Sequence, residues 1–113
     1  MKRIIAFIKP IMRDDVIFAL HDIEGFPGAR ICEVQDTGGG SPDKSEPGDR
    51  TPFHAWPKLV RLEIVCPTER VEEIAETIRK QAHTGLAGDG KIYISAIEDT
   101  ICIRSGERGP SAV

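Results

Sequence analysis

The stretch Thr84-Gly85-Leu86-Ala87-Gly88-Asp89-Gly90-Lys91 separates a helical pattern from a strand pattern, and the rest of the fold can be arranged around it. Glycine reaches positive φ without steric cost and lets backbone N–H groups approach a ligand. A concave row of N–H groups with a lysine at its edge is typical of an anion site. The same residue types also make ordinary connecting turns. The stretch therefore predicts either a phosphate cradle or a simple turn.

A P-loop is excluded, although the spacing from Gly85 to Gly90 and Lys91 is similar. A P-loop follows a strand, opens a helix and carries Ser or Thr after its lysine. In this chain Ile92 follows Lys91, the helix comes first and the strand comes second.

The length of 113 residues predicts one domain, spanning residues 1–113. A composition of 40% hydrophobic and 29% charged residues is typical of a folded protein, and the net charge of −3 without a basic cluster excludes a general nucleic-acid binder. The apolar run at the N-terminus is five residues long and ends before Pro10, which is too short for a signal peptide or a membrane span. We therefore expect a cytoplasmic protein without direct membrane insertion.

The apolar periodicity predicts two helices and five strands. In the first helix Val16, Ala19, Leu20 and Ile23 form one apolar stripe, and Asp14 and Thr68 are candidate N-caps. The first strand is apolar enough to be central and covered on both faces. The predicted strands are 2–9, 30–35, 58–66, 91–97 and 100–104, and the predicted helices are 15–24 and 69–82.

This order predicts an α+β fold, a ferredoxin-like βαββαβ sandwich with an extra C-terminal strand. Both helices would cover one sheet face. The other face would carry Ile5, Phe7, Leu62 and Ile64 or their strand neighbours. Because an exposed apolar face of that size marks an interface, we expect a closed homo-oligomer.

Residues 37–57 contain four glycines, four prolines and no apolar periodicity, so they predict a long protruding loop with a functional role. Its acidic and histidine side chains are either cation ligands or a solvated charged surface. These side chains are Asp43, Glu46, Asp49 and His54. A polar tail, residues 105–113, ends the chain.

Three parts of the sequence resemble the PII signal-transduction proteins. They are the opening Met1–Pro10 with Asp14-Asp15-Val16, the segment His83–Gly85 with Gly88–Ile94, and the end Ile101–Glu107. The likeness covers residues 1–36 and 58–108. It implies a trimer that binds adenine nucleotide in clefts between subunits and regulates a transporter or an enzyme through loop 37–57.

The resemblance also implies a set of nucleotide-binding residues. Gly88, Gly90 and Lys91 would hold phosphates within the same signature as Asp89, and Arg104 would add charge. Phe7, Glu63 and Val65 would lie near the adenine and the base of the cleft, with Gly38 at the root of the loop.

Several positions depart from the family pattern. The usual Gly-Phe-Gly-Arg-Gln loop root is here Asp36-Thr37-Gly38-Gly39-Gly40, a second phosphate arginine is Cys102, and a lysine is Leu86. Since each charge-assisted contact contributes roughly 1.5–3 kcal/mol, we expect ADP or AMP in preference to ATP, and no 2-oxoglutarate. The only tyrosine, Tyr93, lies in a strand, which excludes uridylylation at the family's usual loop position.

The sequence therefore favours a PII-like regulatory protein and not an enzyme. One alternative is a metal-binding trimer linked to heavy-metal efflux, using cysteines with His54. However, Cys32, Cys66 and Cys102 lack C-x-x-C spacing, so they are expected in the core and no metal site is predicted. The other alternative is a small ferredoxin-like phosphate-ester enzyme, which the isolated His21 and His83 do not favour.

Overall fold

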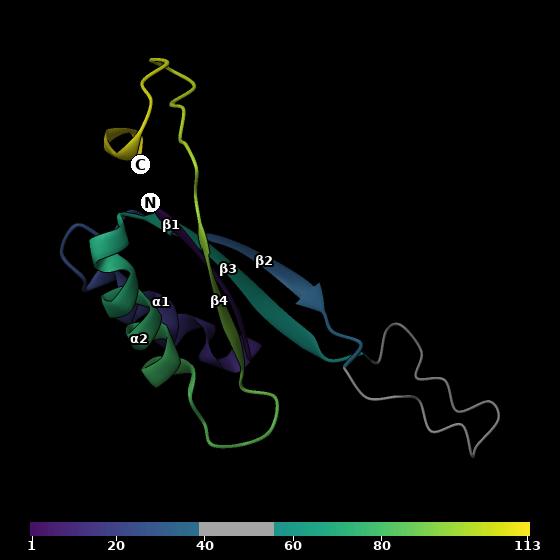
Figure 1. Cartoon of the computed structure of the whole chain (residues 1–113). Helices are drawn as coiled ribbons and strands as arrows, with labels where there is room; N and C mark the ends of the chain where they lie inside the picture. Colours follow the sequence, from purple (N-terminus) through teal and green to yellow (C-terminus); the bar gives the residue numbers. More distant parts are fainter. Residues whose placement is uncertain (39–55) are drawn as a thin grey trace.

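The structure is a computed structural model that describes residues 1–38 and 56–113. Along this part of the chain the main elements follow the order β1, α1, β2, β3, α2, β4 (Figure 1). Their bounds are β1 (Lys2–Ile8), α1 (Arg13–His21), β2 (Arg30–Gln35), β3 (Lys58–Cys66), α2 (Val71–Ala82) and β4 (Gly90–Ala96). Neither α1 nor α2 is long and apolar enough to cross a membrane.

The four strands form one antiparallel sheet in the order β2-β3-β1-β4. Both helices lie on the same face of this sheet, and α1 packs against α2 (Figure 1). The predicted α+β, ferredoxin-like architecture is therefore confirmed. The predicted strands 30–35 and 58–66 have the observed bounds, and β4 begins one residue before the predicted 91–97.

The core lies between the sheet and the helices. Alternate residues of β1, namely Ile4, Ala6 and Ile8, are buried on the helix face, as period-two side-chain alternation requires. Apolar residues of α1 and α2 supply the other half of this core. Its helical members are Val16, Leu20, Val71, Ile74, Ile78 and Ala82.

The helix starts differ from the prediction. A 3-10 turn, Pro10–Met12, runs directly into α1, so the helix begins at Arg13, with Met12 at the N-cap position. Asp14 is therefore inside the first turn, where its negative charge interacts favourably with the helix dipole. Likewise Thr68 opens a second 3-10 turn, and its hydroxyl accepts a hydrogen bond from the N-terminal amine of Met1.

The sheet face away from the helices, called the open face below, corrects two predictions. Leu62 and Ile64 are buried on the helix face, because they pair in register with Ala6 and Ile4. Ile5 and Phe7 do lie on the open face, where they are only partly buried. The central strand β1 is thus covered on one face only within a single chain.

The predicted strand 100–104 does not join the sheet. Ile101 makes only an isolated bridge with Arg108. Between them, the N–H of Cys102 donates to the carbonyl of Glu107 (2.8 Å), and the N–H of Gly106 donates to the carbonyl of Cys102 (2.7 Å). The segment satisfies its backbone groups by folding back on itself, and it extends away from the sheet beyond the end of β4 (Figure 1).

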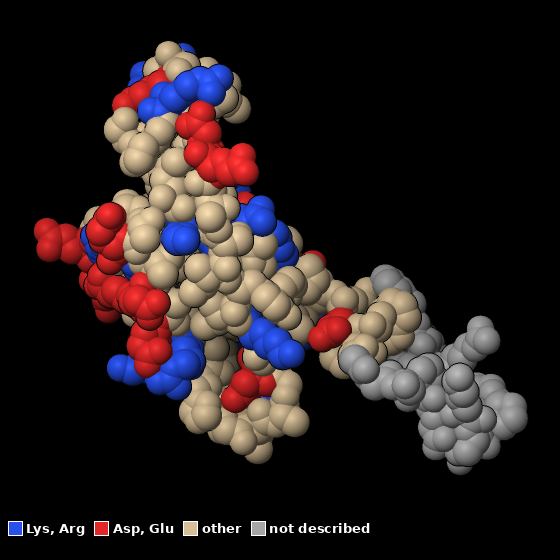
Figure 2. Space-filling model, viewed as in Figure 1, with Lys and Arg blue, Asp and Glu red and all other residues tan. Residues whose placement is uncertain are grey.

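Charge is distributed along α2 in the order that its dipole favours. Glu72 and Glu73 occupy the first turn, and Arg79 and Lys80 occupy the last. Figure 2 shows the corresponding acidic surface over the helices and a basic surface at the end of α2. Of the predicted loop 37–57, residues 39–55 lie outside the described residues. The candidate cation ligands Asp43, Glu46, Asp49 and His54 therefore lie outside them too.

Candidate functional site

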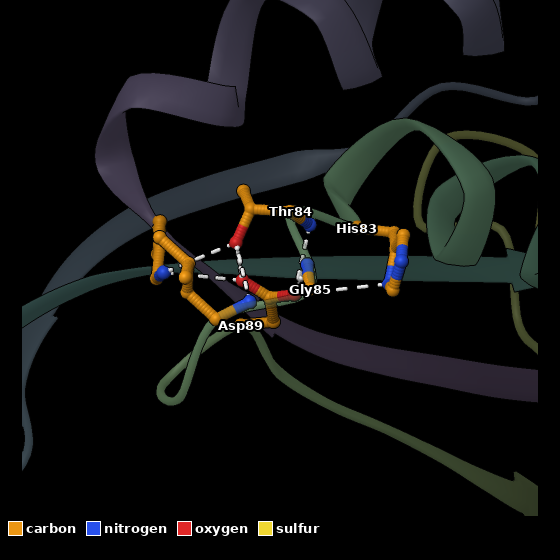
Figure 3. A network of polar contacts seen from close by, with 6 residues as sticks. His83, Thr84, Gly85 and Asp89 are labelled. Atoms are coloured by element: carbon orange, nitrogen blue, oxygen red, sulfur yellow. Dashed lines mark hydrogen bonds and ion pairs between the residues drawn. The ribbon is translucent and has the colours of Figure 1, made fainter.

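The loop between α2 and β4 is organised by the carboxylate of Asp89 (Figure 3). This carboxylate accepts hydrogen bonds from the N–H of Thr84 (2.8 Å), the N–H of Gly85 (2.9 Å) and the hydroxyl of Thr84. The ammonium of Lys9 lies 3.1 Å from the same carboxylate, and Nδ1 of His83 lies 3.8 Å from it. These contacts tie the start of the loop to its end and to the residue that follows β1.

These contacts also fix the ionisation of Asp89. The Thr84 hydroxyl and N–H, together with Lys9 and the Gly85 N–H, hold the pKa of the Asp89 carboxyl well below its usual range. The carboxylate is therefore charged at neutral pH, and its partners within the chain compensate that charge. The sequence predicted Asp89 among the nucleotide-binding residues. In the structure its carboxylate contacts the loop itself, which is a positioning role.

Two glycines give the loop its shape. Gly88 has φ +86° and Gly90 has φ +110°, both in the region that favours glycine. A Cβ on Gly90 would lie 1.7 Å from the carbonyl oxygen of Phe7, so β1 and β4 can meet here only without a side chain. The N–H groups of Ala87 and Gly88 make no hydrogen bond with any residue that the structure describes. They remain available to a ligand, as a phosphate cradle requires.

A cavity of about 840 Å³ lies beside this loop, at one end of the open face. It brings together six of the nine predicted site residues: Phe7, Gly38, Gly88, Asp89, Gly90 and Lys91. In Figure 2 the outline of the molecule is notched on this side, between the glycine loop and the ends of β2 and β3. Segments far apart in the sequence thus converge on one site.

The cavity has an aromatic wall made of the predicted residue Phe7 and of Tyr93, which was not among the predicted site residues. The rings of Phe7 and Tyr93 meet edge to face, with their centroids 6.2 Å apart. Tyr93 lies two residues after Lys91 on the same face of β4, so the strand period was the signal that would have found it. Further apolar lining comes from Val34, Leu59 and Leu86. Such a wall suits a flat, largely apolar ring system.

Lys91 is the positive charge of this cavity. It projects from the start of β4, is exposed, and makes no ion pair with any residue in the described ranges 1–38 and 56–113. The nearby Lys9 is different, because its ammonium is paired with Asp89. The described lining therefore offers one uncompensated cation, Lys91, beside the free backbone N–H of Gly88.

The remaining three predicted residues lie elsewhere in the chain. Val65 pairs with Arg3, four residues from Phe7 along β1, which is roughly 13 Å along the sheet. It lines a second cavity of about 500 Å³ together with Gly28 and Arg30. Glu63 is held by ion pairs with Arg61 (3.0 Å) and Arg30 (3.9 Å). Arg104 is exposed in the turn that follows Ile101.

The described cysteines do not converge. Cys32 is exposed and pairs with Arg61 on the open face, whereas Cys66 is buried on the helix face and Cys102 lies in the C-terminal turn. Burial raises the pKa of the Cys66 thiol, which disfavours the thiolate that a metal needs. Among residues 1–38 and 56–113, no three His, Cys, Asp or Glu side chains are grouped to hold a metal ion.

Comparison with known proteins gives consistent results. The family profile described as nitrogen regulatory protein P-II matches residues 1–107. Proteins named nitrogen regulatory protein P-II are 37% identical in Azospirillum brasilense and 41% identical in Rhodospirillum rubrum, in each case over the full length of both chains. Nitrogen regulatory protein P-II 2 of Methanothermobacter thermautotrophicus is 39% identical over all of this chain and 97% of its own length.

Proposed function

Because the chain belongs to the P-II family of nitrogen regulatory proteins, we propose that it is a regulatory protein that binds an adenine nucleotide beside Lys91. The observation that carries the proposal is the cavity of about 840 Å³, where Lys91 and Gly88 line the same space as the Phe7–Tyr93 pair. The N–H of Gly88 and that of the adjacent Ala87 make no hydrogen bond within the described residues. The cation and the N–H groups suit phosphate, and the aromatic wall suits the base.

The position of the other site residues supports a binding site shared between subunits. Val65 and Lys91 lie at opposite ends of the open face, and Val65 lines a different cavity. A nucleotide that contacts both the Lys91 cavity and the Val65 cavity is therefore expected to lie between the Lys91 end of one subunit and the Val65 end of its neighbour.

The open face supports the homotrimer that such a shared site needs. It carries the partly buried side chains of Ile5, Phe7 and Val65 with no covering element from the described chain. Burial of this face against neighbouring copies would remove apolar surface from water, which stabilises an assembly by about 25 cal/mol per Å².

The bound nucleotide is proposed to be ADP or AMP. The lining offers Lys91 as its single uncompensated cation among the described residues, and Leu86 and Cys102 stand where the family has basic side chains. A triphosphate would leave much of its charge unpaired. The same shortage of positive charge leads us to propose no 2-oxoglutarate site. We also propose a regulatory role without catalysis.

The regulated partner is proposed to be a membrane transporter or an enzyme that contacts residues 37–57. Gly38, at the root of this segment, lines the nucleotide cavity. A ligand in the cavity would therefore contact the chain where the partner-binding segment begins. Nucleotide identity would then bias the partner contact through differential affinity for its conformations.

The proposal is tested by isothermal titration of the purified protein with AMP, ADP and ATP, with and without Mg²⁺. Separate titrations add bicarbonate or 2-oxoglutarate. Saturable binding of about one ADP or AMP per subunit is expected, and 2-oxoglutarate should leave it unchanged. Absence of binding to all three nucleotides contradicts the proposal.

A further inference from the structure

Asp36 contributes a second charge to the cavity, at the end of β2. Its N–H donates to the carbonyl of Pro57 (2.8 Å), and its Oδ1 accepts a hydrogen bond from the N–H of Gly38 (3.0 Å). These two bonds hold the carboxylate at the cavity wall. Its other oxygen has no hydrogen-bond or ion-pair partner within residues 1–38 and 56–113.

The charges of the described lining therefore balance. Asp89 is compensated within its loop by Lys9 and hydrogen bonds, which leaves one cation, Lys91, and one anion, Asp36. The loop on the other side of the cavity presents Leu86, an apolar side chain that is 71% exposed. Each phosphate added to a ligand thus enters a cavity whose described lining within one chain has no further positive charge to receive it.

Strand geometry gives the separation between the backbones of Asp36 and Lys91. Lys91, Phe7, Arg61 and Cys32 form one row across the sheet, and Asp36 follows Cys32 by four residues. With roughly 4.8 Å between strands and 3.3 Å per residue, the two backbones lie about 19 Å apart. Both side chains lie on the open face and line the same cavity. A phosphate chain that extends from Lys91 across this cavity approaches the Asp36 carboxylate, and the repulsion between them grows as the distance falls within the Debye length of about 8 Å at physiological salt.

On the basis of the proposed function, we propose that Asp36 is a specificity-determining residue that limits the number of phosphates on the bound nucleotide. The carboxylate repels each phosphate charge in the cavity, so its effect grows from AMP to ADP to ATP. The preference for a nucleotide with few phosphates then has two causes: one repulsive carboxylate and the lack of further positively charged groups. Selection by a repulsive element is a general route to specificity.

The test is titration of the wild-type protein and Asp36→Asn with AMP, ADP and ATP in EDTA. Asparagine keeps the oxygen that accepts the Gly38 N–H and removes only the charge. The ratio of the ATP Kd to the AMP Kd should fall by at least about threefold, because the two further phosphates of ATP are relieved of repulsion by one partly screened carboxylate. Asp36→Ser, which also keeps an acceptor oxygen, should shift the ratio in the same direction.

Glu33→Gln is the matched control. It removes the same charge from the same strand, but Glu33 pairs with Val60 on the helix face, so the ratio should not change. A ratio that is unchanged or raised in Asp36→Asn overturns this inference alone. In a parallel titration with Mg²⁺, a loss of ATP affinity in Asp36→Asn that is absent in EDTA would assign Asp36 to metal binding and overturn the inference too. If neither protein binds any nucleotide, the proposed function and this inference both fail.

Discussion

Gly90→Ala tests the close approach of β1 and β4 beside the cavity that Lys91 lines. The new Cβ would lie 1.7 Å from the carbonyl oxygen of Phe7 and 2.8 Å from its carbonyl carbon, both of them backbone atoms. No side-chain rotation relieves such a contact, so the beginning of β4 must move away from β1.

The magnitude has two parts. Alanine at φ +110° adds roughly 1–3 kcal/mol of backbone strain. Displacing β4 at the Gly90–Ile8 pair removes one or two ladder hydrogen bonds, each contributing about 0.5–1.5 kcal/mol, and leaves their polar groups poorly satisfied. The expected loss in the free energy of unfolding is about 3–5 kcal/mol, a large fraction of the total stability of a small domain.

Gly88→Ala is the matched control. Gly88 also has positive φ, but the nearest atom to its new Cβ would be Cε of Lys9 at 3.7 Å, an ordinary contact with a flexible side chain. It should cost only the strain, about 1–2 kcal/mol. Both variants are compared by urea unfolding at the same protomer concentration, because oligomerisation would otherwise shift the midpoint. If Gly90→Ala falls within 1 kcal/mol of Gly88→Ala, the close approach is refuted.

Two further predictions concern the loop and the open face. Because the pKa of Asp89 is lowered on folding, its stabilising contribution is present above the unfolded pKa of about 3.9 and is lost as pH falls through the folded value. Asp89→Asn should therefore be less stable than wild type by a constant amount from pH 5 to 8, and the difference should shrink below about pH 4; a difference that grows in acid would contradict the assigned contacts. Ile5→Asp places a charge on the open face and should reduce the mass measured by light scattering to that of a monomer. Phe18→Asp changes a residue of α1 that is 77% exposed and should leave the measured mass at the wild-type value. Equal masses for the two variants would count against burial of the open face.

The strands were predictable because their residues alternate in a pattern that local packing enforces. Lys58–Cys66 is the clearest example, since Leu62 and Ile64 lie on the buried face and Arg61 and Glu63 on the other. What alternation alone does not give is which face meets the helices. The pattern therefore leaves open whether Leu62 and Ile64 or their strand neighbours face away from the helices, and the pairing with β1 decides for the neighbours.

The failures have local physical causes. A helix N-cap was assigned to Asp14 from residue type, but Pro10 starts a 3-10 turn that continues into α1 without a break. The strand predicted at 100–104 satisfies its own hydrogen bonds through Cys102 and Glu107, so its apolar residues do not draw it into the sheet. In the first case a 3-10 turn outweighed a residue-type preference, and in the second a hydrogen-bonded turn outweighed an apolar pattern.

The site was predictable in part. The glycine signature located the Lys91 end of the cavity, because glycines and a lysine before a strand are chemically distinctive. Tyr93 and Asp36 were missed as lining residues, since each resembles an ordinary strand or loop residue until register places it. Separation of Val65 from Lys91 followed only from the observed strand pairing.

The most direct test of a nucleotide site at Lys91 is calorimetric titration of wild type and Lys91→Ala with ADP and AMP under identical conditions. Loss of one charge-assisted phosphate contact should weaken binding about 10- to 150-fold. Lys80→Ala, which removes the same charge from the exposed last turn of α2, should bind as wild type does. Nucleotide binding that is equally strong in wild type and Lys91→Ala, or absent from both, would contradict the account.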